Sequence, residues 1–262
     1  MPRIRANGVS LNYKIDGPEG APWVTFSNSL ATNHSMWDEQ TEALAGRFRV
    51  LRYDTRGHGR SEATKGDYGF DLLVGDVAGL WDALGVEQSH FVGLSMGGMT
   101  GIGLALGHGR RLLSLAACDC RADSPEPFRE DWRKRRAAVE ERGIEAIVEG
   151  NLERWFTPEM RRGPSALLDR VRTMIRTTSV DGFFGCTAAL MNLDYLPRIA
   201  RIRTPTLFVV GAKDGPHPEL MKAMHDRLPG SRYALIEDAA HLSNLEQPER
   251  FNRVILDFLG AA

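Results

Sequence analysis

The sequence has no surplus of charge of either sign. Its 33 lysine and arginine residues nearly balance 34 aspartate and glutamate residues, and the formal net charge is −1 at pH 7. Proteins that bind nucleic acid usually carry a basic surplus, because they must neutralise phosphates. We therefore expect no nucleic-acid partner for this chain.

Long apolar runs are also missing. No window approaches the roughly 18 apolar residues that a membrane-spanning helix needs. The N-terminal stretch MPRIRANGVS lacks the apolar core of a secretion signal. These two absences predict a protein with no membrane partner and a cytoplasmic location.

Cysteine is scarce. The chain contains only Cys118, Cys120 and Cys186, an odd number, and the first two lie close together in a predicted strand. This number and spacing argue against a disulfide framework and favour reduced thiols. No pair of histidines or cysteines accompanies them at the spacing of metal ligands, so we expect no metal site.

The sequence does contain a regular alternation of strands and helices. After a predicted N-terminal hairpin, short apolar runs typical of strands recur at residues 23–28, 49–54, 90–95, 112–119, 205–212 and 232–239. Helical patterns lie between most of these runs, and the one at residues 70–85 ends at a glycine suited to a C-terminal cap. The alternation predicts an α/β fold, in which helices cover both faces of a mostly parallel sheet.

Residues 121–195 break this alternation. They contain no convincing strand and are rich in arginine, and one helical face collects the apolar residues Ile144, Ile147, Val148, Leu152 and Trp155. We expect a helical cap over residues 121–195, inserted into an α/β core made of residues 1–120 and 196–262. The simplest interpretation of the cap arginines is a solvated helix surface.

Ser95 stands in the pentapeptide Gly-Leu-Ser-Met-Gly, between a predicted strand and a predicted helix. Glycines two positions away on either side allow the tight turn of a nucleophile elbow, which presents a serine hydroxyl. The helix that follows has partial positive charge at its N-terminus, which favours negative charge nearby. The pentapeptide alone is a weak signal, but its place after a buried strand makes Ser95 a candidate nucleophile.

A serine nucleophile needs a base, and the base needs an acid that orients it. Asp214 and His241 each follow a predicted strand, where the catalytic groups of parallel sheets gather. The chain order serine, aspartate, histidine is that of the α/β-hydrolase type. We therefore predict that Ser95, Asp214 and His241 form a catalytic triad.

Other residues compete for these roles. Asp119 also follows a strand next to the elbow and is the rival acid, while Asp214 and His241 each have a purely structural alternative as a turn residue and a capping or buried histidine. His58 lies in the turn DTRGHGRS and is interpreted as structural. His34 could border the site, but the sequence names no partner for it.

Acyl transfer also requires donors for the oxyanion of the tetrahedral intermediate. One donor is expected to be the backbone N–H of Met96, directly after the nucleophile. The other is expected in the loop SNSLATNHSMW, where alignment on Trp37 selects the N–H of Leu30.

Six stretches together resemble one known family. They are SNSLATNHSMWDEQ, RYDTRGHGRSEA, HFVGLSMGGMTG, ERWFTPEM, VVGAKDG and AAHLSNLEQPERF. This combination is similar to the 3-oxoadipate enol-lactonase branch of the α/β-hydrolase superfamily, with NSL and RWFTP as the narrower pointers to that branch.

The resemblance implies an α/β-hydrolase fold with a mostly parallel eight-stranded sheet. It implies hydrolysis of the ring ester of an enol-lactone acetate in aromatic catabolism, with no cofactor. The matching residues are Ser95, Asp214 and His241 for the triad, and Leu30 and Met96 for the oxyanion hole. The chain departs from the family at CDCRADSPEPF, where the family has a small polar stretch, and this leaves the substrate open.

Several functions fit the same residues. The leading one is hydrolysis of a lactone or small carboxylic ester, and a general carboxylesterase or perhydrolase is the nearest alternative. A carbon–carbon hydrolase usually carries a His-Gly-Gly-Gly loop, whereas this chain has SNSL there. A haloalkane dehalogenase needs a carboxylate at the nucleophile position, where this chain has Ser95. The alternative that is not an enzyme is a ligand receptor with the same fold and no catalytic turnover. The sequence leaves homo-oligomerisation open.

The cap also offers a binding hypothesis. On a helix Trp132, Arg135 and Arg136 share a face, whereas Arg133 is turned about 100° from Trp132. Burying a substrate carboxylate without a partner is costly, so a cation is expected near it. We predict that Arg135 or Arg136 holds the carboxylate while Trp132 covers the ring.

Overall fold

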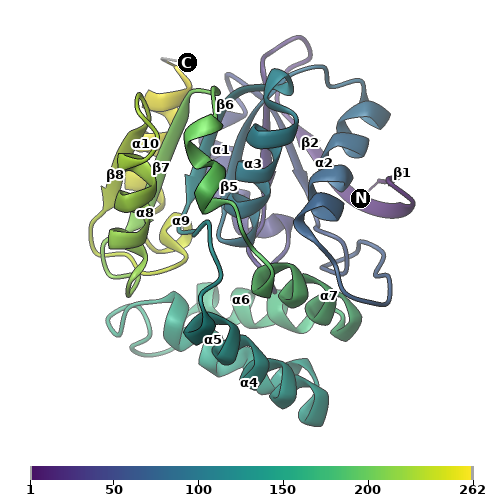
Figure 1. Cartoon of the computed structure of the whole chain (residues 1–262), viewed down its shortest axis with the longest axis vertical. Coiled ribbons are helices and arrows are strands. Elements are labelled where there is room, and N and C mark those ends of the chain that lie inside the picture. Colours follow the sequence, from purple (N-terminus) through teal and green to yellow (C-terminus); the bar gives the residue numbers. More distant parts are fainter. Residues whose placement is uncertain (1, 261–262) are drawn as a thin grey trace.

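One eight-stranded sheet organises the chain, with strand order β1-β2-β4-β3-β5-β6-β7-β8 (Figure 1). The computed structural model describes residues 2–260. The strands are β1 (Arg3–Ala6), β2 (Val9–Asp16), β3 (Trp23–Ser27), β4 (Arg49–Tyr53), β5 (Ser89–Leu94), β6 (Leu112–Cys118), β7 (Thr206–Gly211) and β8 (Arg232–Ile236). Strands β3 to β8 pair in parallel, while β2 is antiparallel to both β1 and β4. The predicted α/β-hydrolase fold with its mostly parallel sheet is confirmed.

The antiparallel edge begins with a tight hairpin. Ala6 pairs with Val9 across a two-residue turn. Both turn residues, Asn7 and Gly8, have positive φ, at 47° and 82°. Asparagine followed by glycine favours such a turn, because these residues adopt positive φ most easily. The tight turn thus explains why β1 and β2 pair antiparallel.

The centre of the sheet is covered on both faces. Every residue of β5 and every residue of β7 is buried. Since successive side chains of a strand point to opposite faces, both faces must be packed against other elements. The helices of this part are α1 (Asp38–Leu44), α2 (Phe70–Leu84), α3 (Met96–Gly107), α8 (His217–Asp226), α9 (Ser243–Glu246) and α10 (Pro248–Leu259). Helix α2 ends at Gly85 in the left-handed conformation, as expected for a C-terminal glycine.

Between β6 and β7 the chain forms a separate group of helices. They are α4 (Glu126–Arg142), α5 (Val148–Trp155), α6 (Ala166–Arg176) and α7 (Val180–Met191), and Figure 1 shows them together at one end of the molecule. The two ends of this segment meet in an isolated antiparallel bridge between Asp123 and Asp194. We propose that residues 121–195 act as a cap on the core.

The three cysteines are buried and free of disulfides. Among residues 2–260, no helix combines the length and the apolar character that a bilayer crossing demands.

Candidate active site

Ser95 lies at a strained turn between β5 and α3. Its φ and ψ are 55° and −115°, a backbone conformation that residues other than glycine rarely adopt. Glycine is needed on both sides, because a Cβ on Gly93 would lie 2.1 Å from the Gly97 carbonyl oxygen, and one on Gly97 would lie 2.1 Å from the Ser27 oxygen. This close packing of α3 against the sheet holds the Ser95 backbone in its strained conformation.

Asp214 and His241 meet beyond the ends of β7 and β8. The Nδ1 atom of His241 lies 2.8 Å from Oδ2 of Asp214. Asp214 is buried, with 6% of its surface exposed. Burial raises the pKa of the Asp214 carboxyl, but the charge and hydrogen bonds of His241 and His217 outweigh it, and the net pKa lies well below the ordinary value. The carboxylate is therefore ionised and suited to orient an imidazole.

Ser95 and His241 line the same cavity, which has a volume of about 380 Å³. Asp214 and Leu30 also contribute to its wall. Among the described residues, no hydrogen bond joins the Ser95 hydroxyl to His241, a looseness that is common in unliganded catalytic sites. The structure thus brings the three predicted triad residues to one cavity, and their catalytic roles stay predictions.

Asp119, the rival acid, takes part in a different set of contacts. Its Oδ1 accepts a hydrogen bond from the Gly211 N–H over 2.8 Å, and its Oδ2 accepts one from the Ser243 hydroxyl over 2.6 Å. Complete burial and the nearby charge of Asp214 raise the pKa of Asp119 well above its usual range. It is Asp214, and not Asp119, that hydrogen-bonds to His241.

The expected oxyanion donors lie near the nucleophile. Met96 is the first residue of α3, where backbone N–H groups have no acceptor within the helix. Leu30 lines the cavity and is buried. Across residues 2–260, its N–H finds no protein acceptor. A buried N–H without a protein partner is rare, and it is what an oxyanion hole would offer.

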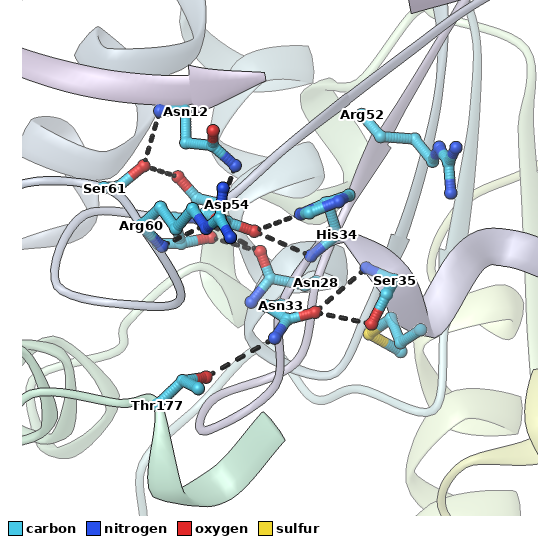
Figure 2. Close-up of polar contacts among 12 residues, drawn as sticks. Asn12, Asn28, Asn33, His34, Ser35, Arg52, Asp54, Arg60, Ser61 and Thr177 are labelled. Atoms are coloured by element: carbon cyan, nitrogen blue, oxygen red, sulfur yellow. Dashed lines mark hydrogen bonds and ion pairs between the residues drawn. The ribbon is translucent and has the colours of Figure 1, made fainter. Parts of the chain in front are cut away.

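A buried polar network fixes the loop that carries Leu30 (Figure 2). Asn28 donates to the carbonyl oxygens of Ser29 and Thr32, and its own side-chain oxygen accepts from the N–H and the hydroxyl of Thr55. These four hydrogen bonds tie the loop to itself and to the turn after β4. Figure 2 also shows Asn33 reaching Thr177, beyond the end of α6, over 3.4 Å.

Asp54 is the acceptor at the centre of this network. One of its oxygens accepts from the His34 N–H at 2.9 Å and faces His34 Nδ1 at 2.7 Å. The other accepts from Asn12 and from the N–H of Arg60. Burial raises the pKa of Asp54, but the hydrogen bonds and charge of His34 bring it below the ordinary value. His34, for which the sequence names no partner, is thus an anchor of the loop.

His58 holds the same loop from the other side. Its Nε2 accepts from the Ala31 N–H over 2.9 Å, and its Nδ1 lies 3.0 Å from the carbonyl oxygen of Arg56. Complete burial lowers the pKa of His58. The structural interpretation of His58 agrees with this geometry, although the sequence did not indicate that it supports Ala31, whose φ is 60°.

The wall opposite the strand ends comes from α4 and α5. Trp132 and Arg135 line the cavity, and the Arg135 guanidinium lies 4.5 Å from the centre of the Trp132 ring. Arg136 does not line it. Its guanidinium donates to the Phe184 carbonyl oxygen and to the Thr187 hydroxyl, because that side of α4 packs against α7. Of the two arginines that the sequence offers as partners for the carboxylate, the structure therefore places Arg135 at the cavity and Arg136 away from it.

Arg154, on α5, is a cavity residue that the sequence reasoning missed. It hydrogen-bonds to Asn151, and among residues 2–260 it forms no ion pair, whereas Arg135 is paired with Asp131. Burial, with the nearby charge of Arg135, lowers the pKa of Arg154 to about 10. Arg154 stands in the RWFTP stretch and is visible in the sequence, but only the fold shows that it lines the cavity beside a second arginine.

The cavity also holds a cluster with the chemistry of metal ligands. Asp214, His217 and His241 each offer one ligand atom, and these atoms lie within 4.8 Å of one another. In this structure Nδ1 of His241 lies 2.8 Å from one oxygen of the shared carboxylate, and Nδ1 of His217 lies 3.2 Å from the other.

Comparison with known proteins gives a consistent result. Residues 22–254 match the model of the alpha/beta hydrolase family. The chain is 35% identical over 255 residues to 3-oxoadipate enol-lactonase 1 of Acinetobacter baylyi, a match that covers 96% of this chain and 94% of that protein.

Solved structures agree. The enol-lactonase from Burkholderia xenovorans LB400 has a TM-score of 0.95 and 38% identity, covering 99% of this chain and 100% of that chain. A thermophilic esterase from Thermogutta terrifontis has a TM-score of 0.92 and 29% identity, covering 100% of this chain and 99% of that one. The chain therefore belongs to the α/β hydrolase family, and within it resembles the 3-oxoadipate enol-lactonases.

Proposed function

We propose that the protein is a serine hydrolase that opens a lactone through an acyl-enzyme, with 3-oxoadipate enol-lactone as the leading substrate. The observation that carries the chemistry is the 2.8 Å contact between His241 and the buried Asp214 in the cavity that Ser95 lines. The similarity to enol-lactonases over nearly the whole chain supports the substrate.

In the proposed reaction, the Ser95 hydroxyl attacks the lactone carbonyl carbon while Nε2 of His241 takes its proton. Asp214 orients the imidazole and stabilises its cationic form. The N–H groups of Leu30 and Met96 bind the oxyanion. His241 returns the proton to the leaving enol oxygen, which stays attached to the acyl group because a ring has opened. Water then attacks the acyl-enzyme with His241 as base.

The cap wall supports a substrate that carries a carboxylate. Arg135 and Arg154 bring two guanidinium groups to the cavity, and Arg154 is free of ion pairs within the described chain. A partly desolvated cation without a counter-ion is unfavourable, and a bound anion relieves that cost. Trp132 gives the same wall an apolar surface suited to a small ring.

A carboxylesterase of broader range is the second candidate. The similarity to the Thermogutta terrifontis esterase favours it, since the two folds agree over the whole chain. A perhydrolase would use the same acyl-enzyme. The ratio of kcat/KM for the carboxylated enol-lactone to that for an uncharged short-chain ester separates the candidates, because only a dedicated lactonase favours the carboxylated ring strongly.

The experiment that tests the proposal is turnover by the wild type and by Ser95→Ala. We expect the variant to lose roughly three or more decades in kcat, as triad deletions do elsewhere. A chromogenic ester tests the receptor alternative, since a receptor would give at most one slow turnover. Retained lactonase activity in Ser95→Ala would remove Ser95 from the mechanism.

A further inference from the structure

A second imidazole lies against the proposed triad acid. His217 is the first residue of α8, and its Nδ1 lies 3.2 Å from Oδ1 of Asp214 and 3.2 Å from the Asp214 carbonyl oxygen. The backbone N–H of His217 also donates to that carbonyl oxygen over 2.9 Å. His241 occupies the other carboxylate oxygen, and the two rings have their centres 5.3 Å apart. One buried carboxylate is thus shared by two histidines.

The surroundings of His217 determine where its proton sits. Both atoms within reach of its Nδ1 are oxygens that only accept, namely a carbonyl and an ionised carboxylate. Nδ1 must therefore carry a hydrogen and donate it. The same reasoning applies to His241 Nδ1 on the opposite oxygen. Nδ1 of His217 thus directs its one hydrogen at Oδ1 and the carbonyl oxygen of Asp214, while Nδ1 of His241 serves Oδ2.

Among residues 2–260, His217 is the one protein group that reaches Oδ1 of Asp214, whereas Oδ2 is served by His241. Asp214 is buried and faces solvent only through the cavity, so water there is the other possible donor to this oxygen. Without His217 the carboxylate would be free to turn about its Cβ–Cγ bond toward other donors. Such a turn would displace the oxygen that orients His241.

We propose that His217 is a positioning residue, which holds Oδ1 of Asp214 so that Oδ2 stays aligned with His241. The inference rests on the proposed function, since it assumes that Asp214 and His241 act as acid and base. It assigns His217 no contact with the reacting atoms, although the residue lines the cavity. The role follows from the shared carboxylate and from the short turn that joins Asp214 to α8.

Three substitutions distinguish this positioning role from two others, namely filling space with the ring and contacting the substrate. His217→Phe keeps the ring volume and removes the donor. His217→Asn places an amide N–H at the position of Nδ1, because both atoms are two bonds from Cβ. His217→Gln carries the same amide one bond further out and is the matched control. The measurements are kcat and KM with 4-nitrophenyl acetate, with thermal unfolding of each variant as a check on folding.

We expect His217→Phe and His217→Gln to lower kcat roughly tenfold, the size of one hydrogen bond to a charged group, with KM changed by less than about twofold. His217→Asn is expected to keep kcat within about threefold of the wild type. Equal losses in the asparagine and glutamine variants, or an effect mainly on KM, would overturn the proposal. The kcat values of His217→Asn and His217→Gln test the proposal even if His217→Phe does not fold.

The Ser95→Ala variant keeps two failures apart. If Ser95→Ala retains turnover of the ester, the proposed function fails, and with it the basis of this inference. If Ser95→Ala is inactive while all three His217 variants match the wild type, the proposed function stands and the positioning role of His217 is wrong.

Discussion

The backbone N–H of Ala31 donates to Nε2 of His58, and the two atoms lie 2.9 Å apart. Because Nε2 accepts this hydrogen bond, the ring proton must sit on Nδ1, where it meets the Arg56 carbonyl oxygen. A protonated His58 would carry a second N–H directed at the Ala31 N–H. The loop that bears Leu30 therefore requires a neutral His58.

This requirement predicts a pH dependence of stability. Burial lowers the pKa of His58 in the folded chain, so below about pH 6.5 the unfolded chain binds a proton that the folded chain does not. The stabilisation is complete above the unfolded pKa and is lost as the pH falls. Urea unfolding at pH 7.5 and 5.5 should show that the wild type loses about 1 kcal/mol more than His58→Gln does. Equal losses in the two proteins would mean that His58 is not the group responsible.

The two buried aspartates should differ sharply in their effect on turnover. Asp214→Asn is expected to lower kcat by roughly three to four decades, because an amide can leave His241 in the wrong tautomer. Asp119→Asn should stay within about tenfold of the wild type, since an amide oxygen still accepts from Gly211 and the contact with Ser243 can persist. Steady-state kinetics on both variants checks this, and the reverse order of damage would make Asp119 the catalytic acid.

The cap arginines should discriminate between charged and uncharged lactones. Methionine keeps most of the stem volume of arginine and removes its charge. Arg135→Met and Arg154→Met are expected to raise KM for the carboxylated lactone by about tenfold or more and to leave an uncharged lactone nearly unaffected.

Arg136→Met is the matched control for that experiment. Arg136 lies on the same helix as Arg135 but contacts Phe184 and Thr187 outside the cavity. It should leave both Michaelis constants within about twofold of the wild type. Equal effects on the two lactones in all three variants would show that the arginines do not bind the carboxylate.

Two glycines of α3 should respond in opposite ways to alanine. Gly97→Ala forces a Cβ to within 2.1 Å of the Ser27 carbonyl oxygen, so α3 must move from the sheet. We expect a loss of about 1–3 kcal/mol in the free energy of unfolding and lower turnover, because the elbow moves with the helix. Gly107→Ala, where nothing lies within 4 Å, should be neutral or slightly stabilising. Denaturant unfolding and kcat on both variants test the contrast.

The sequence predicts well what depends on local pattern. Strand runs, the elbow at Ser95 and the positions of Asp214 and His241 all follow from short stretches whose periodicity and order are visible in the chain. It predicts poorly which side of a helix faces the cavity and which side packs against a neighbouring helix. Helical spacing places Arg135 and Arg136 on one face of α4 but does not say which of them meets the cavity.

Contacts between distant segments are the other limit. His34 pairs with Asp54 and His58 supports Ala31 only because two loops meet beyond the ends of β3 and β4. Arg154 becomes a cavity cation only when the fold brings α5 and Arg135 to the same wall. His217 is an intermediate case, since a histidine three residues after Asp214 is visible in the sequence, but its contact with the carboxylate depends on the turn into α8.

The bridge between Asp123 and Asp194 brings the two ends of the helical segment together at one point beside the sheet. A segment whose two ends leave the core side by side can be lengthened, shortened or exchanged while the strand pairing stays unchanged. The candidate nucleophile, base and acid come from turns that follow the strands, whereas Arg135 and Arg154 come from this segment. Selection for a different ligand can therefore change the part of the gene that encodes this segment, while the part that encodes the candidate triad stays unchanged.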